Sequence, residues 1–185
     1  MISDPPWEYD DSANAGKRGA THKYTVTGID ALCELPIQEL AADDCTMFMW
    51  ATFPMMPEAL RLMSAWGFKY KTAAFVWTKT NKLVDTDFMG MGNWTRANAE
   101  VCLLGTIGNP KRICASVRQG IRTPIERHSK KPEEARRRIE QLMGKDLRKL
   151  ELFARETAPG WSVWGNGVVS TVSMNQKPPT RLRED

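Results

Sequence analysis

The chain has 185 residues, 42% hydrophobic and 26% charged, which is enough to bury the core of one ordinary domain. No run approaches the roughly 18 apolar residues of a membrane helix, and the first residues lack a basic-then-apolar signal pattern, so we expect a soluble, cytoplasmic protein. The four cysteines form no CxxC pair and only two histidines accompany them. This argues against a zinc cluster, predicts that no metal is bound, and favours reduced, mostly buried thiols.

Charge is distributed unevenly along the chain. Residues 1–60 hold ten acidic against three basic side chains, whereas residues 111–138 hold ten Lys and Arg against three Glu. A solvated helix face and a loop would account for such charges one by one. A local excess of this size is also what a polyanion-binding surface needs, which makes nucleic acid a reasonable partner.

Apolar, strand-like runs alternate with helical patterns from residue 45 onward. Residues 45–51 (CTMFMWA) predict a buried strand, and residues 54–67 predict a helix that ends at Gly67. Residues 69–79 predict a second strand, rich in β-branched and aromatic side chains. A long loop, broken by glycine and asparagine, is expected to lead to another buried strand at 99–106.

The alternation continues in the second half of the chain. Residues 129–145 predict a helix that Ser129 caps and Gly144 ends. Residues 149–155 predict a further strand, which residues 161–167 either extend or follow as a turn.

This order of elements indicates one domain over residues 1–169, followed by a polar, loose tail over 170–185. Strands alternating with helices predict an α/β fold with a mostly parallel sheet. In such sheets ligands bind outside the carboxyl ends of the strands, where the loops collect.

The segment Asp4-Pro5-Pro6-Trp7 would be the loop that leaves a short first strand ending at Ile2. Asp4 offers carboxylate acceptors, and the two prolines aim their carbonyls rigidly without a competing N–H donor. Trp7 gives a flat surface on which a flipped base can stack. An exocyclic amine held by such acceptors is pushed toward a tetrahedral nitrogen with an available lone pair. The alternative is a surface turn in which Trp7 is a core anchor.

These and later segments resemble the adenine-N(6) methyltransferase family that includes the catalytic subunit of the eukaryotic mRNA methyltransferase and many phage and bacterial DNA enzymes. The similar segments follow the family's order over roughly residues 3–167: DPPW, THKYTV, MFMWAT, WGFKYKTAAFVWTK, GNWTRANAEVCLLGTIGNPKR, HSKKPEE and KLELFAR with GWSVWGNG. The resemblance implies a Rossmann-like fold with helices on both faces of the sheet, and S-adenosylmethionine as cofactor. In that family the catalytic motif precedes the cofactor strand, which explains why no early GxGxxG motif is present.

The resemblance also implies roles for individual residues. The target amine and base would be bound by Asp4, Pro5, Pro6 and Trp7. The cofactor would be held by Asp4, Lys131, Phe153, Arg155, Asn166 and Gly167. The substrate entrance would be formed by Tyr24, Trp94, Arg96, Asn98 and Glu100, and the basic segment adds Lys111, Arg112 and Arg118 as nucleic-acid contacts.

Three of these residues have a structural alternative. Phe153 would be partly core, Lys131 only the charged start of a basic helix, and Glu100 a strand charge that pairs locally with Arg96. The chain also departs from the family pattern. Only Met1 and Ile2 continue the first strand, Gly167 replaces a common Glu or Gln, and Glu156-Thr157 replaces the His-Asn pair of the eukaryotic branch.

We therefore expect an enzyme of a bacterium or phage-infected cell that methylates the 6-amino group of adenine in DNA. Two alternatives stay open: the same chemistry on RNA, and a non-catalytic nucleic-acid-binding scaffold for an active subunit. A homo-oligomer or a partner subunit is compatible with either. Residues 80–98 and 108–128 are the candidate readers of a recognition sequence.

Overall fold

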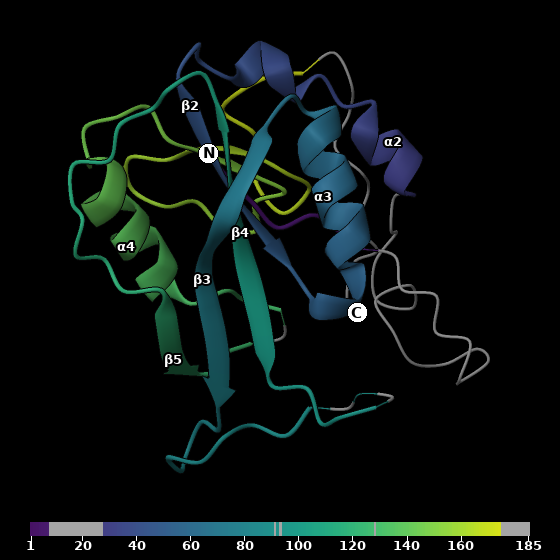
Figure 1. Cartoon of the computed structure of the whole chain (residues 1–185), viewed down its shortest axis with the longest axis vertical. Coiled ribbons are helices and arrows are strands. Elements are labelled where there is room, and N and C mark those ends of the chain that lie inside the picture. The colour runs from purple at the N-terminus through teal and green to yellow at the C-terminus, as the bar shows by residue number, and fades with distance from the viewer. Residues whose placement is uncertain (8–27, 91, 93, 128, 175–185) are drawn as a thin grey trace.

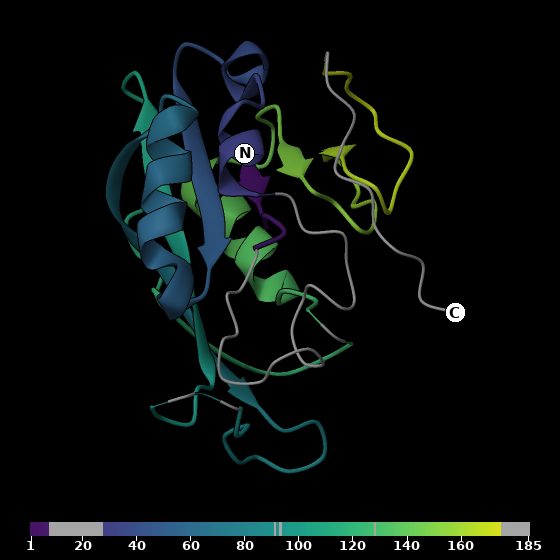
Figure 2. The ribbon, with the colours of Figure 1, turned by 90° about the vertical axis from the view of Figure 1, so that its right-hand side faces the viewer.

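The computed structural model of the chain describes residues 1–7, 28–90, 92, 94–127 and 129–174. In this part of the chain the strands form one seven-stranded sheet with the order β5-β3-β4-β2-β1-β6-β7 (Figures 1 and 2). The strands are β1 (Ile2–Ser3), β2 (Cys45–Ala51), β3 (Lys69–Thr80), β4 (Ala99–Ile107), β5 (Gly120–Pro124), β6 (Leu150–Leu152) and β7 (Ser162–Trp164).

All strands of this sheet except β4 point in one direction. The short β1 lies between β2 and β6 and is parallel to both, and β6 is parallel to β7. The strand β4 is antiparallel to both β2 and β3, and β5 is parallel to β3. The mostly parallel α/β sheet expected from the sequence is therefore confirmed. We call the side at which β1, β2, β3 and β6 end the carboxyl edge.

Helices cover both faces of the sheet. The helices α2 (Ile29–Cys33) and α3 (Met56–Ala65) pack on one face, and α4 (Glu133–Met143) packs on the other (Figure 1). Short 3-10 turns, η1 (Ile37–Leu40) and η2 (Phe53–Met55), complete the first layer.

The strand β2 shows why two cores form. Met47, Met49 and Ala51 point into the core below α2 and α3, whereas Phe48 and Trp50 point into the core below α4. Successive strand side chains face opposite sides of a sheet, so a strand covered on both faces is apolar at nearly every position.

Both long helices occur where the sequence predicts them. After α3, Gly67 has a φ of 80°, a conformation that glycine adopts at little cost, and it ends the helix as predicted. The predicted cap of α4 was wrong. The helix begins at Glu133 after Pro132, whereas Ser129 has a φ of 62° in the preceding turn and lies outside the helix. This turn carries Lys131 toward Asp4 instead of continuing the helix backward.

The elements α2 and β5 were not predicted. The helix α2 has five residues and no side-chain cap, and β5 buries only Ile121, so neither leaves a periodic apolar signal. In the segment assigned to the tail, Thr171 donates its N–H to the carbonyl of Val163 at 2.9 Å, and Val172 and Met174 pack against the core. Residues 175–185 lie outside the described residues.

Candidate active site

The Asp4-Pro5-Pro6-Trp7 loop leaves β1 at the carboxyl edge. Asp4 directly follows Ser3, which pairs with Met49 of β2 on one side and with Leu152 of β6 on the other. The N–H of Trp7 donates to the carbonyl of Pro5 at 2.9 Å and closes a tight turn. Two locked proline φ angles and this hydrogen bond fix the direction in which Asp4 points.

The Trp7 side chain anchors this loop in the core. Its ring is only 6% exposed and belongs to the core below α2 and α3. Its indole N–H donates to the carbonyl of Trp50 at 3.2 Å. The structure therefore places Trp7 in the core, as in the alternative of the sequence analysis, and not as a stacking surface for a flipped base. Burial of the aromatic ring next to β2 stabilises the fold.

Four side chains of alternating charge meet at the carboxyl edge, and we call them the charge chain. Nζ of Lys131 lies 2.9 Å from Oδ1 of Asp4 and 3.1 Å from Oε2 of Glu100. The other oxygen of Glu100, Oε1, accepts from Nζ of Lys79 at 2.6 Å. The side chains are largely buried, with Glu100 12% exposed and Asp4, at 23%, the most exposed.

The charge chain stabilises its own ionised state. Burial alone would raise the pKa of the Glu100 carboxyl, but the Lys131 and Lys79 cations outweigh it and hold this pKa below its ordinary value. Burial alone would lower the pKa of the Lys131 ammonium, but Asp4 and Glu100 outweigh it and raise this pKa. Lys131 is therefore a cation at neutral pH, even though it is nearly surrounded by protein.

A pocket opens beside Asp4 and Lys131. Its walls include Ile2, Trp50, Pro132, Ala135 and Phe153, and its polar lining includes Arg127, Ser129, Lys130, Arg136, Glu151, Arg155 and Glu156. The indole N–H of Trp50 is buried and has no hydrogen-bond partner among the described residues.

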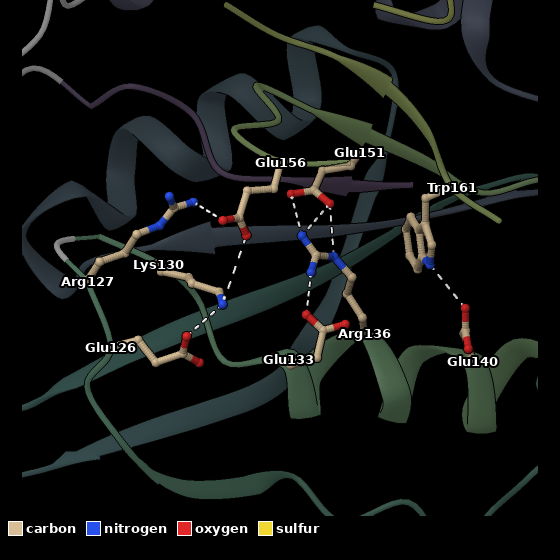
Figure 3. Close-up of polar contacts among 9 residues, drawn as sticks. All are labelled: Glu126, Arg127, Lys130, Glu133, Arg136, Glu140, Glu151, Glu156 and Trp161. Carbon is tan, nitrogen blue, oxygen red and sulfur yellow. Dashed lines mark hydrogen bonds and ion pairs between the residues drawn. The ribbon is translucent and has the colours of Figure 1, made fainter. Parts of the chain in front are cut away.

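Ion pairs tie the two sides of the pocket together (Figure 3). Glu156 contacts Arg127 and, at 3.9 Å, Nζ of Lys130, which also lies 2.6 Å from Glu126. These contacts connect the segment before α4 to the segment after β6.

In the lining of the same pocket, Arg136 of α4 donates to both carboxylate oxygens of Glu151, from Nε at 2.9 Å and from Nη2 at 3.0 Å (Figure 3). Glu133 lies 2.5 Å from the same guanidinium. Burial raises the pKa of the Glu151 carboxyl, although Arg136 opposes this effect. The planar guanidinium therefore fixes Glu151 against α4 by a bidentate contact.

The structure brings four of the predicted cofactor residues together and separates two. Asp4, Lys131, Phe153 and Arg155 line the same pocket, whereas Asn166 and Gly167 are exposed and outside its lining. Phe153 has a φ of 58° and packs 6.3 Å from the Trp66 ring and 5.4 Å from the Trp164 ring, so it is also part of the core.

Gly167 allows a close approach of two backbone segments. A Cβ atom at this position would lie 2.9 Å from the Cα of Arg155. A Glu or Gln at this position would therefore not fit this backbone without a shift.

The predicted substrate entrance also lies at the carboxyl edge. Trp94 is 99% exposed and Arg96 is exposed, and Asn98 accepts the N–H of Lys79 through its carbonyl at 2.9 Å. Glu100 pairs with Lys79 and Lys131, so the expected local pair with Arg96 is replaced by the charge chain. Tyr24 lies outside the described residues.

The other basic candidates lie elsewhere. The strand β4 ends at Ile107, opposite the first residue of β2, so Lys111 and Arg112 follow at the far edge of the sheet. The seven residues of β2 separate this edge from Asp4 by about 20 Å. Arg118 precedes β5 and accepts from Arg138 of α4 through its carbonyl at 2.7 Å.

Several residues of the site were missed by the sequence analysis, namely Lys79, Arg127, Lys130, Glu151 and Glu156. Lys79 had a usable signal, since it is a cation at the end of a predicted strand and hence at the edge where ligands bind. The others come from elements whose alignment across the pocket exists only in the folded chain.

The described residues hold no group of three or more His, Cys, Asp or Glu side chains arranged to hold a metal ion. None of their helices is long and apolar enough to cross a membrane. The four cysteines are free thiols, and only Cys102 is buried.

Known proteins resemble this chain over most of its length. A family model described as MT-A70 matches residues 1–167. The type II methyltransferase M.MunI of a Mycoplasma species is 36% identical over 184 residues, which cover 89% of this chain and 75% of that protein. An N6-methyladenosine RNA methyltransferase of Pyricularia oryzae is 28% identical, with 91% of this chain and 46% of that protein covered. A putative N(6)-adenosine-methyltransferase of Medicago truncatula is also 28% identical, with 90% of this chain and 26% of that protein covered.

Proposed function

This chain belongs to the MT-A70 family, and on that premise we propose that it transfers a methyl group from S-adenosylmethionine to the 6-amino group of adenine in DNA. The observation that carries the proposal is the placement of Asp4. Asp4 follows the central β1 at the carboxyl edge, and its carboxylate is held by the largely buried Lys131 and lines the pocket. The choice of DNA is supported by the higher identity to the type II methyltransferase than to the RNA methyltransferase.

The loop supplies acceptors for an amine. One oxygen of Asp4, Oδ1, is bound by Lys131. The carbonyl of Pro5 accepts from Trp7 through one lone pair and retains a second, and neither proline competes with an N–H. We expect the two amine N–H groups to be held by Asp4 and a proline carbonyl, which makes the nitrogen lone pair available without a strong base.

The chemistry of the pocket fits S-adenosylmethionine. This cofactor carries an ammonium, a carboxylate, ribose hydroxyls and a flat base. Acidic side chains such as Asp4 and Glu156 suit the ammonium and hydroxyls, the cations Arg127 and Arg155 suit the carboxylate, and the apolar lining suits the base. When bound, the cofactor supplies an electrophilic methyl group. The role of Lys131 is to hold Asp4 in place and to balance its charge.

The exposed Trp94 suits a nucleic-acid substrate. A fully exposed indole in the loop between β3 and β4 offers a stacking surface that the buried Trp7 does not. Because Trp94 lies six residues before Glu100, it belongs to the loop that borders the charge chain.

The test is transfer of tritiated methyl to matched DNA and RNA oligonucleotides that contain adenine. Wild type is compared with Asp4→Ala and with Asp30→Ala, a control at an exposed carboxylate that forms an ion pair with Arg61. We expect label on adenine of DNA, lost in Asp4→Ala and retained in Asp30→Ala.

The other outcomes revise the proposal in distinct ways. Label on RNA alone would mean that RNA, not DNA, is the substrate. Equal label from Asp4→Ala and wild type would contradict the role of the loop. If neither polymer is labelled and calorimetry detects no cofactor binding, the scaffold alternative is favoured. Cofactor binding without label would instead point to another substrate or a missing partner.

A further inference from the structure

We propose that Lys79 is a positioning residue for Asp4 and acts on it through Glu100 and Lys131. The inference rests on the function proposed for Asp4, because it concerns how that carboxylate is held. Lys79 itself contacts Glu100, and three ion pairs connect it to Asp4. The proposal requires no contact between Lys79 and the substrate.

The register of β3 and β4 places Lys79 correctly for this task. Trp77 of β3 pairs directly with Glu100 of β4, and Lys79, two residues further, lies on the same face of the sheet. Nζ of Lys79 lies 5.2 Å from the centre of the Trp77 ring. Stacking on this ring and the 2.6 Å contact to Oε1 of Glu100 define where the ammonium group lies.

Glu100 transmits this placement because its two oxygens have different partners. Oε1 binds Lys79, and Oε2 binds Lys131. A carboxylate whose two oxygens are bound by two different lysine side chains cannot rotate freely. Its second oxygen therefore presents a fixed acceptor to Lys131, and this directs the remaining donors of Lys131 toward Asp4.

The balance of charge leads to the same conclusion. The charge chain holds two cations and two carboxylates, so it is neutral as a whole. Without Lys79, two carboxylates would share the single Lys131 ammonium in a largely buried position. Glu100 would then bind a proton more readily, and Lys131 would donate to Asp4 alone, which makes Asp4 a weaker acceptor for an amine.

Two other titratable groups lie near the charge chain. The Cys102 thiol of β4 lies near both Asp4 and Lys131, and Glu151 of β6 lies near Asp4. Burial raises the pKa of Cys102, so this thiol stays neutral, and Glu151 is paired with Arg136. Neither group can replace the cation that Lys79 contributes to Glu100.

The first experiment measures the charge chain without any activity. The side-chain carboxyl groups of glutamate are labelled with carbon-13 and titrated by NMR, and the Glu100 signal is assigned from its absence in Glu100→Gln. We expect Lys79→Met to raise the pKa of Glu100 by about one unit or more, and Lys79→Arg to restore it. The control is Lys71→Met, at an exposed lysine of the same strand, which is expected to leave Glu100 unchanged.

The second experiment is a double-mutant cycle on kcat. We expect Lys79→Met to lower kcat on the order of tenfold in the wild-type background, with the acid limb of the pH profile moved to higher pH. In the Glu100→Gln background the same substitution should have less than about a twofold effect, because its route to Asp4 is gone.

Two results would overturn the proposal: an equal loss of kcat in both backgrounds, or a Glu100 titration that Lys79→Met leaves unmoved. If Lys79→Met does not fold, Lys79→Gln removes the charge and keeps a donor, with the same shifts expected. A wild-type protein that methylates nothing would refute the proposed function, while the NMR titration would still decide whether Lys79 controls Glu100.

Discussion

Replacing Lys131 by methionine removes the one cation that Asp4 and Glu100 share. Methionine keeps the length and apolar stem of the side chain, so the change is mainly one of charge. Nζ of Lys131 lies 2.9 Å from Asp4 and 3.1 Å from Glu100, and the side chain is only 17% exposed. Removing one partner of such a buried pair leaves an uncompensated carboxylate, which costs about 3–5 kcal/mol of unfolding free energy near pH 8.

The loss of unfolding free energy must depend on pH, and the direction of this dependence follows from the pKa of Glu100. In the wild type its pKa lies below the ordinary value, so the stabilisation is present above about pH 4.3 and is lost as the pH falls through the lowered pKa. In the variant only Lys79 still opposes the effect of burial, so the pKa of Glu100 lies above its wild-type value. The difference between the proteins therefore grows with pH by up to about 1.4 kcal/mol per unit until the raised pKa is passed.

The measurement is urea unfolding of both proteins at several pH values from 5 to 8. The matched control is Lys130→Met, at the neighbouring lysine whose partners Glu126 and Glu156 are more exposed. We expect less than about 1 kcal/mol from the control, with little dependence on pH. A destabilisation by Lys131→Met that is small, or equally large at pH 5 and pH 8, would refute the idea that Lys131 neutralises these carboxylates.

Three further predictions concern the loops and the thiols. Trp94→Ala should weaken binding of adenine-containing oligonucleotides by about 1–3 kcal/mol in fluorescence anisotropy and leave the melting temperature unchanged, because the ring is 99% exposed. Gly167→Gln should lower stability by about 1–3 kcal/mol in thermal unfolding, since its Cβ would lie 2.9 Å from the Cα of Arg155. Iodoacetamide should label Cys114 first, because the hydroxyl of a neighbouring serine lowers its thiol pKa, and Cys102 last, because burial raises its thiol pKa. Mass spectrometry of partly labelled protein measures this order, and the reverse order would contradict the prediction.

The strands and helices that build the core could be predicted because each carries a local signal. Residues 45–51 are apolar at every position except Thr46, and β2 is covered on both faces. Edge elements carry no such signal. The strand β5 has a single buried residue, Ile121. Its only neighbour in the described sheet is β3, so its formation depends on a partner far away in sequence.

The sequence predicts those parts of the site whose location depends only on the order of the strands. The end of β1 had to lie at the carboxyl edge, so Asp4 could be placed from the sequence. The roles of the two tryptophans could not. Trp7 and Trp94 have the same side chain, but one is 6% and the other 99% exposed, since a ring packs only where the neighbouring elements leave a space for it.

The basic segment shows how a count of charges differs from a charged surface. Of its ten Lys and Arg residues, seven form ion pairs in the described structure, for example Arg136 with Glu151 and Lys131 with Asp4. Cations that already neutralise carboxylates release few counterions when nucleic acid binds.

The affinity for DNA should therefore depend less steeply on salt than ten phosphate contacts would imply. The basic residues of this segment without an ion pair in the described structure are Lys111, Arg112 and Arg118, of which the first two lie at the far edge. Even with Arg96 added, about four phosphate contacts give a slope of log K against log salt near −4, whereas ten would give about −9. Anisotropy titrations from 50 to 200 mM salt measure this slope. A value near −9 would mean that the ion pairs open on binding and that the whole segment contacts the backbone; a shallow slope leaves base stacking and the pocket as the main sources of affinity.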